Sequence, residues 1–208
     1  MIRSTRLLLI GGVVAGPLFL ALWALQAFTR EGFRPAFHPL SLLSLGAGGW
    51  VQIANFVLTG ILLIGAGLGL RRSSQRAPGV TWTALLVALM GVGLVIAGVF
   101  VTDAGAGFPE GAPEGAPQLS WHGAVHEVGF ILTQLAFVSA TILLAVRFGR
   151  ARRPGWMIVS IVALVAAVGV AAVGAPETMA IRLVVSSAIE LGLVAAISAL
   201  ALREGDRA

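Results

Sequence analysis

Long apolar runs separated by short polar segments dominate the chain. Six of these runs can cross a hydrocarbon core of about 30 Å as helices that rise about 1.5 Å per residue. The third and fifth runs contain no ionisable residue. We therefore predict an all-α membrane protein, a single domain over residues 1–208, whose spans cover approximately residues 7–28, 48–70, 80–102, 121–146, 156–174 and 178–202.

The composition agrees with this class. The chain is 58% hydrophobic and 11% charged, and so little charge cannot form the polar surface that a soluble protein of this length needs. The basic side chains are all arginines that flank apolar runs, which indicates contact with membrane lipids and not with nucleic acid. The absence of cysteine excludes disulfides, thiolate metal ligands and a thiol nucleophile.

The arginines also predict an orientation. All of them except Arg30, Arg34 and Arg182 fall on one side of a six-span topology, so this side is expected to face the cytoplasm and to hold both termini. The high Ala and Gly content favours a bacterial plasma membrane. The first run follows two arginines and resembles a secretory signal peptide, but its length favours a retained helix.

Two segments on the predicted outer side differ in kind. Residues 29–47 are too apolar to extend into water, so we expect an interfacial or re-entrant turn. Residues 103–120 are rich in Gly, Pro and Glu, and such a composition predicts a mobile loop that does not pack. Glycines within the second and third spans, among them Gly60 and Gly91, are expected to allow close helix packing.

Several polar residues lie in the outer parts of the spans, where lipid would make them costly. They predict a polar cup that opens outward above an apolar floor. Arg182 and Glu190, eight residues apart, are expected to lie roughly on one helix face. The candidate ligand-binding residues of this cup are Gln52, Asn55, Gln134, Arg182 and Glu190.

The three histidines fall at one predicted membrane depth. His122 and His126 are four residues apart, the spacing with which two imidazoles bind one metal ion. With His38 and Asp103 they would form a set that zinc accepts, and Glu127 would act as a base or an outer partner. Two alternatives remain open, namely a purely structural hydrogen-bonded cluster and a site for haem or another cofactor.

The same residues carry a family resemblance. The run His38-Pro39-Leu40-Ser41, the later Gly49-Trp50 and Asn55-Phe56, and His122-Gly123-Ala124-Val125-His126 resemble domain-of-unknown-function family 998. That resemblance implies six membrane helices and no particular chemistry. A looser similarity to alkaline-ceramidase-like membrane hydrolases implies a Ser, an Asp and three His around zinc, roles that Ser41, Asp103, His38, His122 and His126 would fill.

These features leave four functional hypotheses. The first is a zinc-dependent membrane hydrolase with Asp103 or Glu127 as the proton acceptor and Ser41 or Arg182 stabilising an oxyanion. The second is a non-catalytic binder or transporter of a lipid or small solute. Haem-based electron transfer ranks lower, because the inner halves of the spans contain no histidine. The fourth is a structural scaffold for a partner membrane protein.

Overall fold

The computed structural model describes residues 1–73 and 80–207. Within these residues, six helices are long and apolar enough to cross a membrane, which confirms the predicted all-α, multi-spanning fold class. In chain order the elements are α1 (Arg3–Thr29), the 3₁₀ helix η1 (Leu40–Ser44), α2 (Gly49–Ser73), α3 (Val80–Val99), α4 (Trp121–Arg150), α5 (Pro154–Ala172), the 3₁₀ helix η2 (Pro176–Thr178) and α6 (Met179–Arg207).

Several helices continue past the apolar runs that predicted them. α1 begins at Arg3, α4 ends at Arg150 and α6 ends at Arg207, so helical backbone extends into the arginine-bearing segments. Arginine has a high helix propensity and does not stop a helix at the edge of the hydrocarbon core. α5 starts at Pro154, where a proline at the first helical position costs no hydrogen bond.

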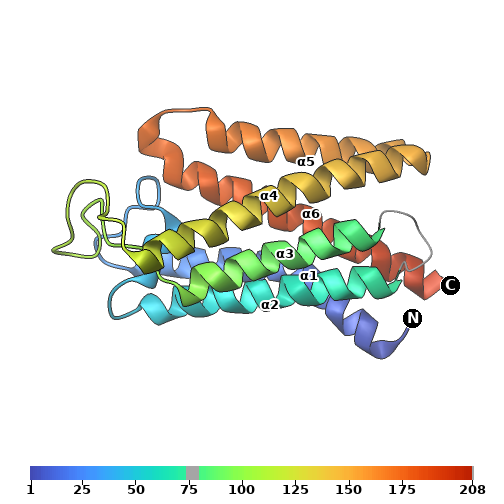
Figure 1. Cartoon of the computed structure of the whole chain (residues 1–208), viewed down its shortest axis with the longest axis horizontal. Coiled ribbons are helices and arrows are strands. Elements are labelled where there is room, and N and C mark those ends of the chain that lie inside the picture. The colour runs from blue at the N-terminus through green and yellow to red at the C-terminus, as the bar shows by residue number, and fades with distance from the viewer. Residues whose placement is uncertain (74–79, 208) are drawn as a thin grey trace.

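The helices run roughly along one long axis, so the molecule has two distinct ends (Figure 1). One end, called here the terminal end, holds both chain termini and the junction between α4 and α5. The other, called the loop end, holds residues 30–48, 100–120 and 173–178. The predicted inward-facing arginines lie at the terminal end, except for Arg76, which is outside the described residues.

α1, α2 and α3 form a tightly packed set that the glycines make possible. A Cβ atom on Gly60 of α2 would lie 2.5 Å from the carbonyl oxygen of Gly91 on α3. Without side chains at this crossing, the two backbones come into direct contact. α4 joins α3 in the same way, since a Cβ on Gly129 would lie 2.7 Å from the Gly93 carbonyl oxygen.

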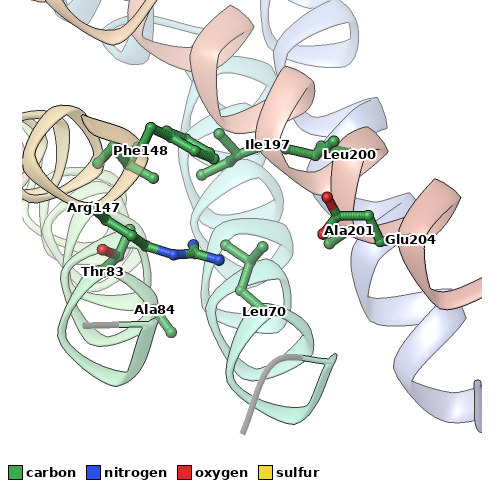
Figure 2. Close-up of a pocket in the computed structure, with 10 residues that line it drawn as sticks. Leu70, Thr83, Ala84, Arg147, Phe148, Ile197, Leu200, Ala201 and Glu204 are labelled. Carbon is green, nitrogen blue, oxygen red and sulfur yellow. The ribbon is translucent and has the colours of Figure 1, made fainter. Parts of the chain in front are cut away.

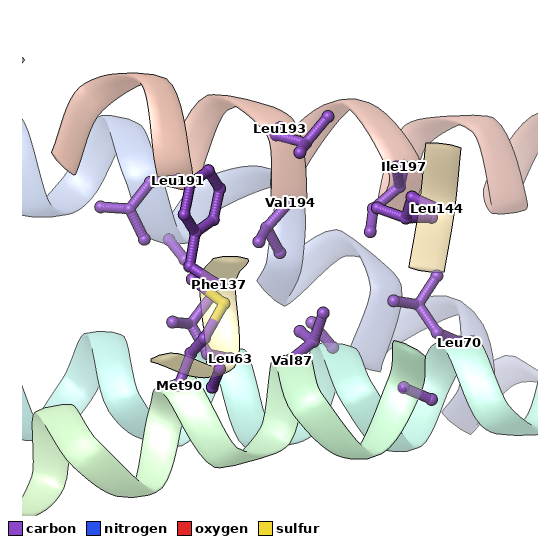
Figure 3. Close-up of a cluster of buried hydrophobic side chains, with 14 of the residues drawn as sticks. Leu63, Leu70, Val87, Met90, Phe137, Leu144, Leu191, Leu193, Val194 and Ile197 are labelled. Carbon is purple, nitrogen blue, oxygen red and sulfur yellow. The ribbon is translucent and has the colours of Figure 1, made fainter. Parts of the chain in front are cut away.

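The main apolar core fills the space between these helices and α6. Figure 3 shows Phe137 of α4 and Leu191 of α6 above Leu63 and Met90, which come from α2 and α3. α5 contributes one of its two buried residues, Ala167, to this core, and Trp156 and Leu164 pack against it. α6 contacts mainly α1 and α5, and α5 also contacts α4, so that α5 covers one outer face of the bundle (Figure 1).

The prediction that residues 103–120 do not pack is wrong at Phe108. Its side chain is 2% exposed and contacts Phe33 edge-on, with ring centroids 5.3 Å apart. The loop also folds on itself through hydrogen bonds from Ala106 N to Gly115 O and from Gly107 N to Pro113 O, each 2.9 Å. One aromatic residue and local turns therefore anchor a segment that is otherwise rich in Gly, Pro and Glu.

Candidate functional site

A pocket of about 420 Å³ lies between α4 and α6 in the half of the molecule nearest the loop end. This volume is within the range of about 300–1,000 Å³ that is usual for small-molecule sites. α4 and α6 form its walls, η1 and the preceding residue close it toward the loop end, and α1, α2 and α3 form its floor. Its lining residues are Phe19, Pro39, Leu40, Ser41, Phe56, Leu63, Met90, Leu94, Ala97, His126, Glu127, Phe130, Thr133, Gln134, Met179, Leu183, Ser187, Glu190 and Leu191.

The pocket opens sideways between the two wall helices. α4 and α6 cross and diverge toward the loop end in Figure 1, and no lining residue comes from α5. On the two walls, Phe130 of α4 is 41% exposed and Met179 of α6 is 48% exposed, and Glu127 is also exposed. The opening therefore lies on the outer surface of the α4–α6 pair.

Glu190 is the most deeply buried acid of this site. It is 3% exposed and lies eleven residues into α6, about 16 Å from the start of that helix. Its Oε1 atom accepts hydrogen bonds from Gln134 Nε2 at 3.0 Å and from Ser186 Oγ at 3.1 Å. These bonds satisfy one carboxylate oxygen within an otherwise apolar wall, and the bond from Gln134 joins α4 to α6.

The two histidines of α4 contact the end of α3. His126 Nδ1 lies 2.9 Å from Ala97 O and 3.0 Å from Phe100 O, and His122 Nδ1 lies 2.9 Å from Val101 O. A carbonyl oxygen only accepts, so Nδ1 is the donor in both rings. The four-residue spacing of these histidines therefore ties the start of α4 to carbonyls at and just beyond the end of α3.

His38 uses both ring nitrogens for backbone contacts. Its Nδ1 accepts from Arg34 N at 2.9 Å, and its Nε2 donates to Ala106 O at 3.0 Å. Burial lowers the pKa of His38 below its ordinary value of 6.5 and the nearby Arg34 adds to this, whereas the bond to Ala106 opposes it. His38 thus joins residues 30–40 to the 103–120 loop as a neutral imidazole.

The predicted zinc set of His38, Asp103, His122 and His126 does not assemble. Among residues 1–73 and 80–207, no three His, Asp or Glu side chains are grouped so that they could hold a metal ion. His38 has no free nitrogen for a metal, and His122 approaches Asp103 at 3.8 Å from Nδ1 to Oδ1. Zinc binding needs free lone pairs that converge on one point, so these residues do not fit it.

Asp103 instead organises the start of α4. Its carboxylate accepts from Ser120 N at 2.8 Å and from Ser120 Oγ at 2.6 Å, and Ser120 Oγ in turn accepts from Gly123 N. The bond from the Ser120 hydroxyl lowers the pKa of Asp103 below its ordinary value of 3.8, against the opposing effect of burial. Asp103 therefore stabilises the helix N-terminus through its capping serine, and it does not line the pocket.

Gln52 and Asn55 lie in a separate polar contact between α1 and α2. Gln26 Nε2 donates to Gln52 Oε1 at 2.9 Å, and Asn55 Nδ2 donates to Phe19 O at 3.1 Å. Gln52 and Asn55 are fully buried and neither lines the pocket. Sequence reasoning did not select Gln26, although an isolated amide inside the first apolar run was the available signal.

Arg182 does not share a face with Glu190. Eight helical residues turn through about 800°, which leaves the two side chains about 80° apart. The Arg182 guanidinium donates to Ala171 O at 2.9 Å and to Ala175 O at 3.1 Å, at and beyond the end of α5. It therefore binds carbonyls at the α5–α6 junction, and the expectation that it belongs to the polar cup is wrong.

A second, much smaller pocket surrounds Arg147 at the terminal end. The Arg147 side chain extends between Leu70 and Thr83 with Phe148 and Ile197 nearby (Figure 2). This pocket has a volume of about 20 Å³, which is enough for about one water molecule and no larger ligand. The pocket between α4 and α6 is therefore the better candidate for a functional site.

One comparison with known proteins gives a match. The model of the family described as "Protein of unknown function (DUF998)" matches residues 13–204. The chain belongs to this family. Searches among curated proteins and among solved structures each found no match.

In this DUF998 protein the structure brings together only some of the predicted site residues. Ser41, His126, Glu127, Gln134 and Glu190 all line the pocket between α4 and α6. The remaining predicted residues take part in the backbone and helix contacts described above; they are His38, Gln52, Asn55, Asp103, His122 and Arg182.

Proposed function

We propose that this protein is a non-catalytic binder of a lipid-like amphiphile, which enters the pocket between α4 and α6 from the membrane. The observation that supports this best is a largely apolar pocket of about 420 Å³, with polar groups from Ser41, Gln134 and Glu190. An apolar cavity with few polar groups suits an acyl chain whose polar part is held at specific points.

The arginine distribution adds an orientation to this proposal. The terminal end faces the cytoplasm of a bacterial plasma membrane, and the loop end faces outward, because basic residues are retained on the cytoplasmic side. The pocket then opens into the outer leaflet. Hydrolysis has weaker support, since no hydrogen bond of the described residues links Ser41 Oγ to His126 or Glu127.

Occupancy of the pocket is tested with a blocking variant. Ser187→Trp places an indole on the pocket wall, whereas Val185→Trp places the same group on a surface of α6 that is 42% exposed. We expect lipid extracted from purified protein to contain a species that the Ser187→Trp variant loses and the Val185→Trp variant retains. Equal lipid content in both folded variants would contradict the proposal.

The orientation is tested separately by labelling introduced cysteines, because the sequence contains no cysteine of its own. Gly115 at the loop end and Gly155 at the terminal end each have open space around an added Cβ atom. In intact cells, a membrane-impermeant maleimide is expected to label the Gly115→Cys variant and not the Gly155→Cys variant. Labelling of Gly155→Cys alone would reverse the orientation and leave the pocket proposal intact.

A further inference from the structure

The second oxygen of the Glu190 carboxyl group is available to a ligand. Oε1 accepts both described hydrogen bonds, from Gln134 and Ser186, whereas Oε2 takes part in no hydrogen bond of the described residues. Glu190 lines the inner end of the pocket, because the α6 lining residues run from Met179 to Leu191. A buried carboxylate is costly unless it meets an opposite charge or a donor, so this oxygen is a recognition point for a group that supplies one.

The charged side chains that line the pocket are both acidic. They are Glu190 on the α6 wall and the exposed Glu127 on α4, and none of the lining residues is an arginine. The three loop-end arginines have other contacts: Arg30 donates to Leu45 O at 2.6 Å, the Arg34 guanidinium lies over the Phe37 ring, and Arg182 donates to carbonyls of the α5–α6 junction. The pocket therefore offers two carboxyl groups that no arginine of its lining pairs with.

Aromatic faces accompany the two acids. Phe19, Phe56 and Phe130 line the same pocket, and the Phe19 and Phe56 rings lie 6.0 Å apart on its floor. Aromatic faces attract cations through their quadrupole, and this attraction is strongest where water is excluded. Carboxylates and phenyl rings without a competing guanidinium are the combination that recognises an ammonium group.

We propose that the pocket selects amphiphiles with a positively charged amine or quaternary ammonium group over neutral and anionic ones. This inference rests on the proposed binding function and names the class of its ligand. The apolar tail lies among Leu63, Met90 and Leu94, and the cation lies between Glu190 and Glu127. The opening between α4 and α6 gives such a molecule a path from the lipid phase.

The test compares three probes with one tail: octyltrimethylammonium, octanol and octyl sulfate. Equilibrium dialysis against the full chain in nanodiscs measures binding, and the Ser187→Trp variant defines the signal that does not come from the pocket. We expect pocket-specific binding of octyltrimethylammonium to be about 10-fold tighter than that of octanol. Octyl sulfate is expected to show no pocket-specific binding.

Glu190→Gln retains an oxygen acceptor for Gln134 and removes the charge, so it should weaken cation binding about 10-fold and leave octanol binding unchanged. If Glu190→Gln does not fold, Glu127→Gln tests the mouth of the pocket instead. We expect this variant to weaken binding of octyltrimethylammonium about threefold. Glu110→Gln, an exposed loop residue outside the pocket, is the matched control.

The outcomes separate the two proposals. Pocket-specific binding of octanol or octyl sulfate as tight as that of the cation overturns the inference and leaves the proposed binding function standing. Unchanged cation affinity in the folded Glu190→Gln or Glu127→Gln variant also overturns it. If none of the three probes shows binding that Ser187→Trp removes, and no lipid is lost from that variant, the proposed function itself fails.

Discussion

Gln134 of α4 donates a 3.0 Å hydrogen bond to Glu190 of α6 across the wall of the pocket. Both residues belong to helices that otherwise diverge toward the loop end (Figure 1). The bond therefore lies where the pocket begins, and it both fixes the carboxylate and limits the separation of the two helices.

The strength of this bond is measurable by a double-mutant cycle. We expect Gln134→Leu and Glu190→Leu to show a coupling energy of about 0.6–1.7 kcal/mol in unfolding from mixed micelles, the range found for hydrogen bonds between membrane helices. Gln134→Leu combined with Glu204→Gln, at the terminal end, is expected to be additive. Equal coupling in both cycles would contradict a direct interaction between Gln134 and Glu190.

The α2–α3 crossing predicts a position-specific cost for alanine. Gly60→Ala puts a methyl group 2.5 Å from Gly91 O, so the helices must separate, and we expect a loss of about 1–3 kcal/mol in the free energy of unfolding. Gly192→Ala on α6 meets no atom within 4 Å and should be neutral or slightly stabilising. Thermal unfolding of both variants measures the difference, and similar melting temperatures would contradict the close crossing.

His38 predicts that anchoring of the 103–120 loop weakens in acid. Because burial lowers its pKa in the folded protein, the unfolded chain binds a proton more readily below about pH 6.5. The stabilising effect of His38 is therefore complete above that pH and decreases as the pH falls toward the folded-state pKa. As the pH falls from 7 to 5, the amides of Ala106 and Gly107 should lose protection against hydrogen exchange, measured relative to their intrinsic exchange rates.

The control for this pH effect is His38→Asn, whose amide oxygen can accept from Arg34 N without titrating in that range. We expect exchange in this variant to lose its dependence on pH over the same interval, after correction for the intrinsic rate. A slope that matches the wild-type protein would show that another group causes the effect.

Asp103 predicts a stability effect at the start of α4. Asp103→Asn retains one oxygen acceptor but replaces the second with an amide donor, so either Ser120 N or Ser120 Oγ loses its partner. We expect a loss of about 1–2 kcal/mol in the free energy of unfolding, comparable to that of a helix-capping residue. The lowered pKa of Asp103 means that the wild-type stabilisation is present above about pH 3.8 and is lost as the pH falls further.

Denaturant titrations at pH 7 and pH 3 check this prediction. The difference between the wild-type protein and Asp103→Asn should be larger at pH 7 than at pH 3, because the wild-type carboxylate becomes protonated in acid. Glu110→Gln, in the same loop and fully outside this contact, should change little at either pH. If the wild-type protein and Asp103→Asn differed in unfolding free energy by the same amount at pH 7 and pH 3, a role for the ionised carboxylate would be contradicted.

The six apolar runs by themselves determined the helical class, because a backbone in lipid must satisfy its hydrogen bonds internally and a helix does so locally. Sequence reasoning also selected His126, Glu127, Gln134 and Glu190, which line the pocket, since polar groups in apolar runs are rare enough to stand out. Ser41, which lines it too, was selected through the looser similarity to membrane hydrolases. It failed for the histidines, because residues at the same predicted depth in the membrane were expected to lie close to one another. His38 and His126 are near the same end of the bundle, yet each binds a different backbone segment.

Tertiary structure alone decided which polar residues share a cavity. The divergence of α4 from α6 depends on how glycines and large side chains interdigitate along several helices, and no local pattern in the chain records that angle. The partner of each histidine likewise depends on where the last carbonyls of α3 and the 103–120 loop come to lie. Helix formation is encoded within a few neighbouring residues, whereas a pocket is a product of distances between helices.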